Sequence, residues 1–218
     1  MTDQGRKKIA VIDYGAGNIM SVMQALHLVG KDVEVLLTAD EKEIRSADRI
    51  ILPGVGAFGD AMGRLDSTGL SDVIRDVIAE GKLFMGICLG LQLLFDESEE
   101  SPGVRGLSVL HGRIRRLPEG EGRKVPQIGW NRLSFPNPGR LFDASLFGQD
   151  PGCGEPYAYF VHSYYLEAED PSVVAATCEY GVTVHAAVEK ENLFACQFHP
   201  EKSDRFGLTI LHNFVNLL

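Results

Sequence analysis

The chain of 218 residues is 44% hydrophobic, so it can bury a sizeable core, and no low-complexity linker divides it. Its 21 basic and 30 acidic residues give a net charge of −9, which argues against a general nucleic-acid or anionic-membrane partner, because both bind basic surfaces. The apolar run after Lys8 is too short for a signal peptide or a membrane span, so we expect a cytoplasmic protein that forms a single domain over residues 1–218.

The first half of the chain alternates short apolar strands with amphipathic helices. Strands are expected over 8–12, 33–37, 49–52 and 83–87, and helices over 19–29, 71–80 and 89–95. Continuous apolar strands that are separated by helices are typical of a parallel sheet with both faces covered. This half therefore predicts an α/β fold.

The second half is richer in strands. Strand-like runs occupy 107–113, 158–166, 173–178, 182–188 and 193–198, the Pro- and Gly-rich stretch 118–156 reads as loop, and a last helix is expected over 208–218. The predicted fold class is α/β, with a mostly parallel central sheet, helices on both faces and additional β structure in the second half.

Cys88 stands between an apolar strand and a helix, with Gly86 and Gly90 two residues before and after it. This pattern is typical of a nucleophile elbow, in which glycines leave room for a sharp turn. The helix N-terminus would favour the thiolate, and the Leu89 N–H could stabilise an oxyanion. The alternative is a buried structural cysteine, which is our interpretation of Cys178 and Cys196. The four cysteines form no C-x-x-C pair, so neither a metal cluster nor a disulfide framework is predicted.

A general base is indicated by His199, which stands two residues before Glu201. Residues i and i+2 of an extended backbone point to the same side, so the carboxylate can hold one ring nitrogen while the other faces Cys88. This is the nucleophile–base–orienter arrangement of covalent catalysis. The order Cys, His, Glu disfavours an α/β-hydrolase, in which the acid precedes the histidine.

A glycine-rich loop, 53–59, follows the third predicted strand. Its backbone N–H groups lie on the carboxyl edge of the sheet, where α/β sites are found, and could face a developing negative charge. The alternative is a simple tight turn. No Gly-Lys-Ser/Thr follows, so the loop is not a nucleotide P-loop.

Together these segments resemble the class I (triad) glutamine amidotransferases. The glycine loop, the elbow with Gln92, and His199-Pro200-Glu201 stand in that family's order. Segments 13–18, 126–131, 160–165 and 198–203 are similar to those of the branch that supplies ammonia to a cyclase, and the similarity runs from about Ile9 to the C-terminus. Gln127 departs from that branch, where a histidine is expected.

The resemblance implies a glutaminase in which Cys88, His199 and Glu201 form the catalytic triad. It implies an oxyanion hole made by Val55, Gly56 and Leu89. It implies that the substrate contacts are Gly54, Gln92, Glu100, His162, Ser163 and Tyr164. Glu100 would face the α-ammonium group of glutamine, although the acidic run 96–100 could equally be solvated surface.

The resemblance also implies a heterodimer with a cyclase subunit, and no metal or organic cofactor in this chain. The cyclase would use the ammonia to make imidazole glycerol phosphate and aminoimidazole carboxamide ribotide in histidine biosynthesis. Asn18, Trp130 and Asn131 are the predicted partner interface. Trp130 is the only tryptophan and is expected in a loop between glycine and asparagine. Aromatics of this kind are enriched at interface centres. The alternative for Trp130 is a buried core residue.

Other functions remain open from the residues. The chain could be the glutaminase of another ammonia-channelling synthase, a cysteine peptidase or γ-glutamyl hydrolase working alone, or a non-catalytic docking module. Dependence of glutamine hydrolysis on the partner separates these classes.

Overall fold

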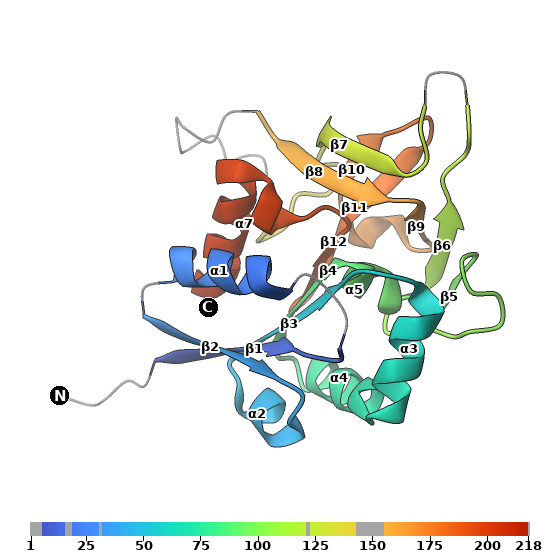
Figure 1. Cartoon of the computed structure of the whole chain (residues 1–218). Coiled ribbons are helices and arrows are strands. Elements are labelled where there is room, and N and C mark those ends of the chain that lie inside the picture. Colours follow the sequence, from blue (N-terminus) through green and yellow to red (C-terminus); the bar gives the residue numbers. More distant parts are fainter. Residues whose placement is uncertain (1–5, 16–18, 31, 121–122, 143–154, 218) are drawn as a thin grey trace.

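The computed structural model describes residues 6–15, 19–30, 32–120, 123–142 and 155–217. Within these ranges, seven strands form the central sheet in the order β10 (Val174–Glu179), β11 (Thr183–Lys190), β12 (Leu193–Cys196), β4 (Leu83–Cys88), β3 (Arg49–Gly54), β1 (Lys7–Ile12) and β2 (Val33–Thr38) (Figure 1). Neighbouring strands from β12 to β2 are parallel, whereas β11 and β10 are added antiparallel. The predicted, mostly parallel sheet is therefore confirmed.

Helices cover both faces of this sheet (Figure 1). One face packs against α1 (Ile19–Val29) and α7 (Asp204–Asn216), and the other against α2 (Glu41–Ser46), α3 (Phe58–Ser67), α4 (Leu70–Ala79) and α5 (Leu89–Leu93). Successive strand residues alternate between the two layers: Ile9 and Val11 belong to the first core cluster, and Ala10 and Ile12 to the second. Because both faces are buried, the middle strands β3, β4 and β12 are mostly apolar.

Extra β structure lies beside the central sheet, as predicted. The sheet of β5 (Glu97–Ser98), β6 (Gly112–Arg116) and β9 (Tyr164–Ala168) is three-stranded within the described residues, and β7 (Gln127–Arg132) pairs with β8 (Tyr157–His162) in a separate antiparallel ribbon.

Three of the predicted strand and loop boundaries in this half are wrong. The run 158–166 is two strands rather than one, because the chain breaks at Ser163 and its halves join different sheets. The run 107–113 is mostly irregular, since the Leu107 N–H donates to the Leu93 carbonyl instead of a strand, and the strand begins only at Gly112. The stretch expected as loop over 118–156 contains β7.

Sequence patterns also missed two helices and misjudged the ends of others. Asp40 caps α2 by accepting hydrogen bonds from the Lys42 and Glu43 N–H groups. The helix has too few apolar residues to show a helical period, so this cap alone did not reveal it. The glycine-rich loop runs directly into α3. The helix after Cys88 ends at Leu93, not at residue 95, and α7 begins at Asp204. Two 3₁₀ turns, η1 (Pro171–Val173) and η2 (Pro200–Lys202), complete the elements of the described part of the chain. Among the described helices, none combines the length and apolar character needed to cross a bilayer.

Candidate active site

The chain turns sharply at Cys88, between the end of β4 and the start of α5. Cys88 has φ 55° and ψ −109°, a conformation that costs a non-glycine residue energy and is therefore concentrated at functional sites. The flanking glycines are required by space: a Cβ on Gly90 would stand 1.9 Å from the Leu52 carbonyl oxygen, and a Cβ on Gly86 2.8 Å from that of Gly90. The turn thus has the geometry expected of a nucleophile elbow.

His199 and Glu201 form a buried pair. His199 follows β12 in an extended conformation, and η2 turns the chain so that its Nδ1 atom lies 2.9 Å from Oε1 of Glu201. Burial by itself lowers the pKa of His199, but the adjacent Cys88 and Glu201 side chains outweigh it and raise the pKa to about 9. The imidazolium form of His199 is therefore favoured beside the sulfur.

Cys88 and His199 both line a cavity of about 310 Å³. Its lining residues are Val55, Gly56, Cys88, Leu89, Gln92, Glu100, Val161, His162, Ser163, Tyr164 and His199. The structure therefore brings the predicted nucleophile, base, oxyanion residues and most of the predicted substrate contacts to one place. Gly54 is beside Cys88 as its partner across the β3–β4 pair.

Glu100 is not part of a solvated acidic surface. It is half-buried, lines the cavity, and its Oε2 atom accepts a hydrogen bond of 2.8 Å from the Phe58 N–H at the start of α3. A carboxylate fixed in the wall of a small cavity can receive a cationic group of a ligand.

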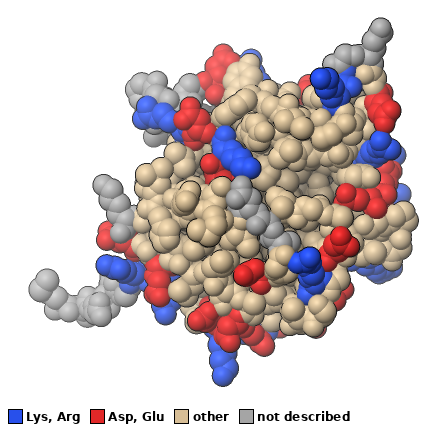
Figure 2. All heavy atoms as spheres, viewed as in Figure 1, with Lys and Arg blue, Asp and Glu red and all other residues tan. Residues whose placement is uncertain are grey.

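Trp130 lies in strand β7, not in a loop, and its residue is 49% exposed, so the buried-core alternative is wrong. Its ring packs edge-on against Tyr159 of β8, with centroids 6.0 Å apart. Ile128 and Tyr157 of the same ribbon are also exposed. Uncharged side chains predominate over β7 and β8 (Figure 2). The ribbon thus presents an apolar surface of the kind found in interface cores.

Of the other two predicted interface residues, one is less exposed than Trp130 and one lies outside the described residues. Asn131 is half-buried, and its Oδ1 atom accepts a hydrogen bond of 2.8 Å from Nε2 of Gln127. Gln127 itself is fully buried, so it faces inward rather than toward a partner. Asn18 and Cys153 lie outside the described residues, whereas Cys178 and Cys196 are buried free thiols, as expected.

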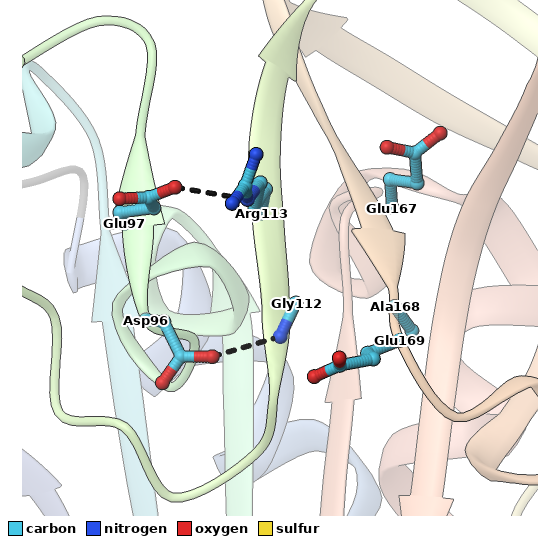
Figure 3. A pocket seen from close by; sticks show the side chains of 7 residues that line it. All are labelled: Asp96, Glu97, Gly112, Arg113, Glu167, Ala168 and Glu169. Atoms are coloured by element: carbon cyan, nitrogen blue, oxygen red, sulfur yellow. Dashed lines mark hydrogen bonds and ion pairs between the residues drawn. The ribbon is translucent and has the colours of Figure 1, made fainter.

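A larger hollow of about 580 Å³ lies elsewhere, between Asp96–Glu97, Gly112–Arg113 and 167–169 (Figure 3). Asp96 accepts a hydrogen bond of 3.0 Å from the Gly112 N–H, and Arg113 pairs with Glu97 at 2.9 Å. Its described lining residues include neither a cysteine nor a histidine. The hollow lacks the nucleophile and base that the smaller cavity combines.

Three residues with close contacts to the site have no predicted role. Gln197 donates a hydrogen bond of 3.7 Å to the Cys88 sulfur. The Tyr14 hydroxyl is buried at the place where a Cβ on Gly54 would stand, 2.4 Å away. Ser203 holds the segment of the base: its Oγ donates to the His199 carbonyl and accepts from the Tyr159 N–H. The position of Gln197, a polar residue directly after an apolar strand, is the signal that could have identified it. Tyr14 and Ser203 fall in segments 13–18 and 198–203, which carry the resemblance, but no local pattern assigns either of them a role.

Comparisons with known proteins agree with this geometry. Residues 10–217 match the family Glutamine amidotransferase class-I. The imidazole glycerol phosphate synthase subunit HisH of Moorella thermoacetica is 50% identical over 97% of this chain and 96% of its own length, and that of Bacillus subtilis is 47% identical over 96% of each.

Solved structures share the fold at low sequence identity. PurLQS from Thermotoga maritima superimposes with a TM-score of 0.67 at 20% identity, covering 97% of this chain and 98% of that one. The glutaminase domain of CTPS from Trypanosoma brucei, solved with bound acivicin, gives a TM-score of 0.66 at 16% identity, covering 96% and 91%.

Proposed function

The chain belongs to the class I glutamine amidotransferases, and from this premise we propose that it is the glutaminase subunit of imidazole glycerol phosphate synthase. It hydrolyses glutamine to glutamate and ammonia, and acts as one domain over residues 1–218. The observation that carries the proposal is the cavity in which Cys88 and His199 meet, in a chain that matches HisH subunits over nearly its whole length.

Catalysis is covalent. The Cys88 thiolate attacks the side-chain carboxamide carbon of glutamine, and His199 protonates the departing ammonia. Water that His199 deprotonates then cleaves the thioester and releases glutamate. Glu201 orients the imidazole and stabilises its protonated form, a role that its 2.9 Å contact with Nδ1 supports.

The remaining lining residues bind the substrate and its negative charge. The N–H groups of Val55, Gly56 and Leu89 stabilise the oxyanion, and one such donor is typically worth about 10²–10³ in rate. Glu100 receives the α-ammonium group, and Gly54, Gln92 and the 162–164 segment form the rest of the glutamine site. The cavity volume of about 310 Å³ is at the lower limit for small-molecule pockets, in keeping with an amino acid.

A cyclase subunit docks on the apolar ribbon around Trp130 and Asn131, with Asn18 as a further contact expected from the sequence, and receives the ammonia. The geometry supports coupling between this face and catalysis. Tyr159, which packs against Trp130, accepts a hydrogen bond of 2.9 Å from the His199 N–H. A partner that docks on the ribbon can therefore shift the backbone of His199 through this hydrogen bond. We expect docking also to reshape the Gly54–Gly56 backbone for oxyanion binding. Such a complex works in the cytoplasm, in histidine biosynthesis.

The proposal is tested by measuring glutamine hydrolysis with the chain alone, with the cyclase, and with the cyclase plus its nucleotide ligand. A channelling subunit responds strongly to the partner, a solitary hydrolase is indifferent to it, and a docking module is silent throughout. Cys88→Ala should abolish glutamine-dependent synthesis while synthesis from added ammonia survives. Cys196→Ala is the matched control, because burial raises the pKa of that thiol well above its usual range and keeps it inert. Retention of more than a few per cent of activity in Cys88→Ala would reject the mechanism.

A further inference from the structure

A chain of buried amide groups leads from the wall of the cavity to the sulfur of Cys88. The Tyr164 carbonyl accepts a hydrogen bond of 3.0 Å from Nε2 of Gln92. The same nitrogen donates to Oε1 of Gln197, also at 3.0 Å, and Nε2 of Gln197 lies 3.7 Å from the Cys88 sulfur. Gln92 is 5% exposed and Gln197 is fully buried, so water does not compete for these groups.

The direction of every bond in this chain is set by its first member. A backbone carbonyl can only accept, so the Gln92 amide must present its nitrogen to Tyr164. The second hydrogen of that nitrogen then needs an acceptor, which fixes the oxygen of Gln197 toward Gln92. The nitrogen of Gln197 is consequently left facing the sulfur. The amide orientation at Cys88 is thus imposed by the network and is not a free choice between oxygen and nitrogen.

The sheet register holds this contact in place. Cys196 of β12 pairs with Ile87 of β4, so Gln197 and Cys88 are the next residues along two neighbouring parallel strands. The Gln197 N–H donates to the Ala186 carbonyl at 2.8 Å, which ties its backbone to β11 as well. A donor that directly follows β12 and is bonded to β11 and to Gln92 costs little reorganisation when charge develops on the sulfur.

We propose that Gln197 is a further catalytic residue, which donates its side-chain N–H to the Cys88 thiolate and aligns the sulfur for attack. This role rests on the proposed function, since it assumes that Cys88 is the nucleophile. Two residues then stabilise the charge on the sulfur in different ways. His199 exchanges protons with the reacting groups, whereas Gln197 keeps its proton and supplies a fixed dipole. Because Gln92 and Tyr164 line the cavity, the same chain links glutamine binding to the sulfur.

Other titratable groups near the sulfur must be separated from this effect. His199 and, behind it, Glu201 face Cys88 from the segment after β12, Tyr14 from the segment after β1, and Cys196 from β12. Glu100, His162 and Tyr164 share the cavity. All are unchanged in a variant of Gln197, so a shift in the reactivity of Cys88 reports the lost donor.

The experiment is the pH dependence of Cys88 alkylation by iodoacetamide, followed by peptide mass spectrometry so that only Cys88 is counted. Gln197→Met keeps the side-chain volume without a donor, and Gln197→Glu keeps an acceptor for Gln92 but turns an oxygen toward the sulfur. A hydrogen bond to a charged group typically changes an ionisation constant by a factor of about 10 to 100, and sulfur is a weak acceptor. We therefore expect the midpoint of alkylation to move up by about one pH unit in Gln197→Met, and further in Gln197→Glu, with kcat reduced more than KM.

Cys196→Ala is the control, because it loosens the same buried strand end but leaves the Gln197 amide in place; its alkylation midpoint should equal that of the wild type. A wild-type midpoint in a folded Gln197→Met or Gln197→Glu variant overturns the inference. A measurement on the unsubstituted residue decides even where both variants fail to fold: the side-chain amide ¹⁵N signal of Gln197 should titrate with the alkylation midpoint and lose that transition in Cys88→Ala. An amide signal that is insensitive to Cys88 also overturns the inference. A wild type whose Cys88 shows no thiolate reactivity at all contradicts the proposed function instead.

Discussion

The Nδ1 atom of His199 lies 2.9 Å from Oε1 of Glu201, and both side chains are almost completely buried. The contact fixes the tautomer and the tilt of the ring, so the second nitrogen is the one available to the sulfur.

We predict that His199→Ala is more damaging than Glu201→Gln. In the proposed mechanism His199 moves protons in both half-reactions, so its loss should lower kcat on the order of 10⁶, whereas loss of the orienting charge should lower kcat about 10⁴-fold. The measurement is kcat for glutamine hydrolysis with saturating cyclase, with thermal unfolding as the check on folding. Equal losses in two folded variants would mean that Glu201 has a different role.

A second prediction concerns Glu100. Glu100→Gln keeps an acceptor for the Phe58 N–H but removes the negative charge, so α3 should remain anchored while KM for glutamine rises about tenfold or more. Glu99→Gln is the matched control, because that exposed neighbour does not line the cavity. An unchanged KM in Glu100→Gln rejects contact with the substrate ammonium.

Trp130→Ala should weaken the complex with the cyclase about 30-fold, the effect of losing a hot-spot aromatic, and reduce stimulation of glutamine hydrolysis. Asn18→Ala is expected to act in the same direction. Leu37→Ala provides the comparison, since Leu37 is another exposed apolar residue, on the edge strand β2. The measurements are the Kd for the cyclase by titration calorimetry and the stimulated rate. Full stimulation and unchanged affinity in Trp130→Ala and Asn18→Ala would remove the docking site from this face.

His162 should make folding sensitive to acid. Burial, together with the charge of His199, lowers the pKa of His162 to about 4, although the Tyr164 carbonyl opposes this by accepting from Nδ1. An unfolded histidine titrates near 6.5, so between about pH 6.5 and 4 the unfolded state binds the extra proton. The free energy of unfolding should therefore fall as the pH is lowered through this window, by at most about 1.4 kcal/mol per pH unit.

His162→Asn should flatten that slope, as measured by urea unfolding at pH 6.5, 5.5 and 4.5, because the amide nitrogen can still donate to Tyr164 but does not titrate. Replacement of an exposed histidine on α1, as in His27→Asn, should leave the slope intact. A wild-type slope in His162→Asn would show that another group causes the acid sensitivity.

Most of the central sheet could be predicted from the sequence, because a strand that is buried on both faces has no polar alternation to confuse the pattern. Residues Ile9 to Ile12 show this, with 0% exposure on either side. The errors fall where chain-distant partners decide the structure. Leu107 and Leu110 are buried apolar residues of the kind found in strands. Their backbone is nevertheless irregular, because their N–H groups donate to carbonyls at the end of α5. The chain breaks at Ser163 because β8 and β9 join two different sheets, and no local sequence pattern indicates this break.

The site divides in the same way. Cys88, His199 and Glu201 are marked by short-range patterns, namely flanking glycines and a two-residue spacing, whose geometry is local. Gln197 acts on a residue 109 positions away, and its role requires the pairing of β12 with β4, which spacing does not encode. The glycine and asparagine beside Trp130 predict a loop, but pairing with β8 makes this segment a strand.

The ribbon of β7 and β8 pairs only within itself among the named strands, whereas Cys88 and His199 follow adjacent strands of the central sheet. The ribbon that we propose for partner recognition and the strands that carry the thiol chemistry thereby belong to different sheets, and the Tyr159 carbonyl, which accepts a hydrogen bond from the His199 N–H, joins them. Retargeting such a scaffold to a different ammonia consumer therefore calls for changes to the exposed side chains of the ribbon, because its backbone and the cavity residues Val161 and His162 must stay in place for catalysis. A variant that carries another amidotransferase's side chains at the exposed positions Ile128, Trp130 and Tyr157 should keep its thiolate reactivity and lose only its choice of partner.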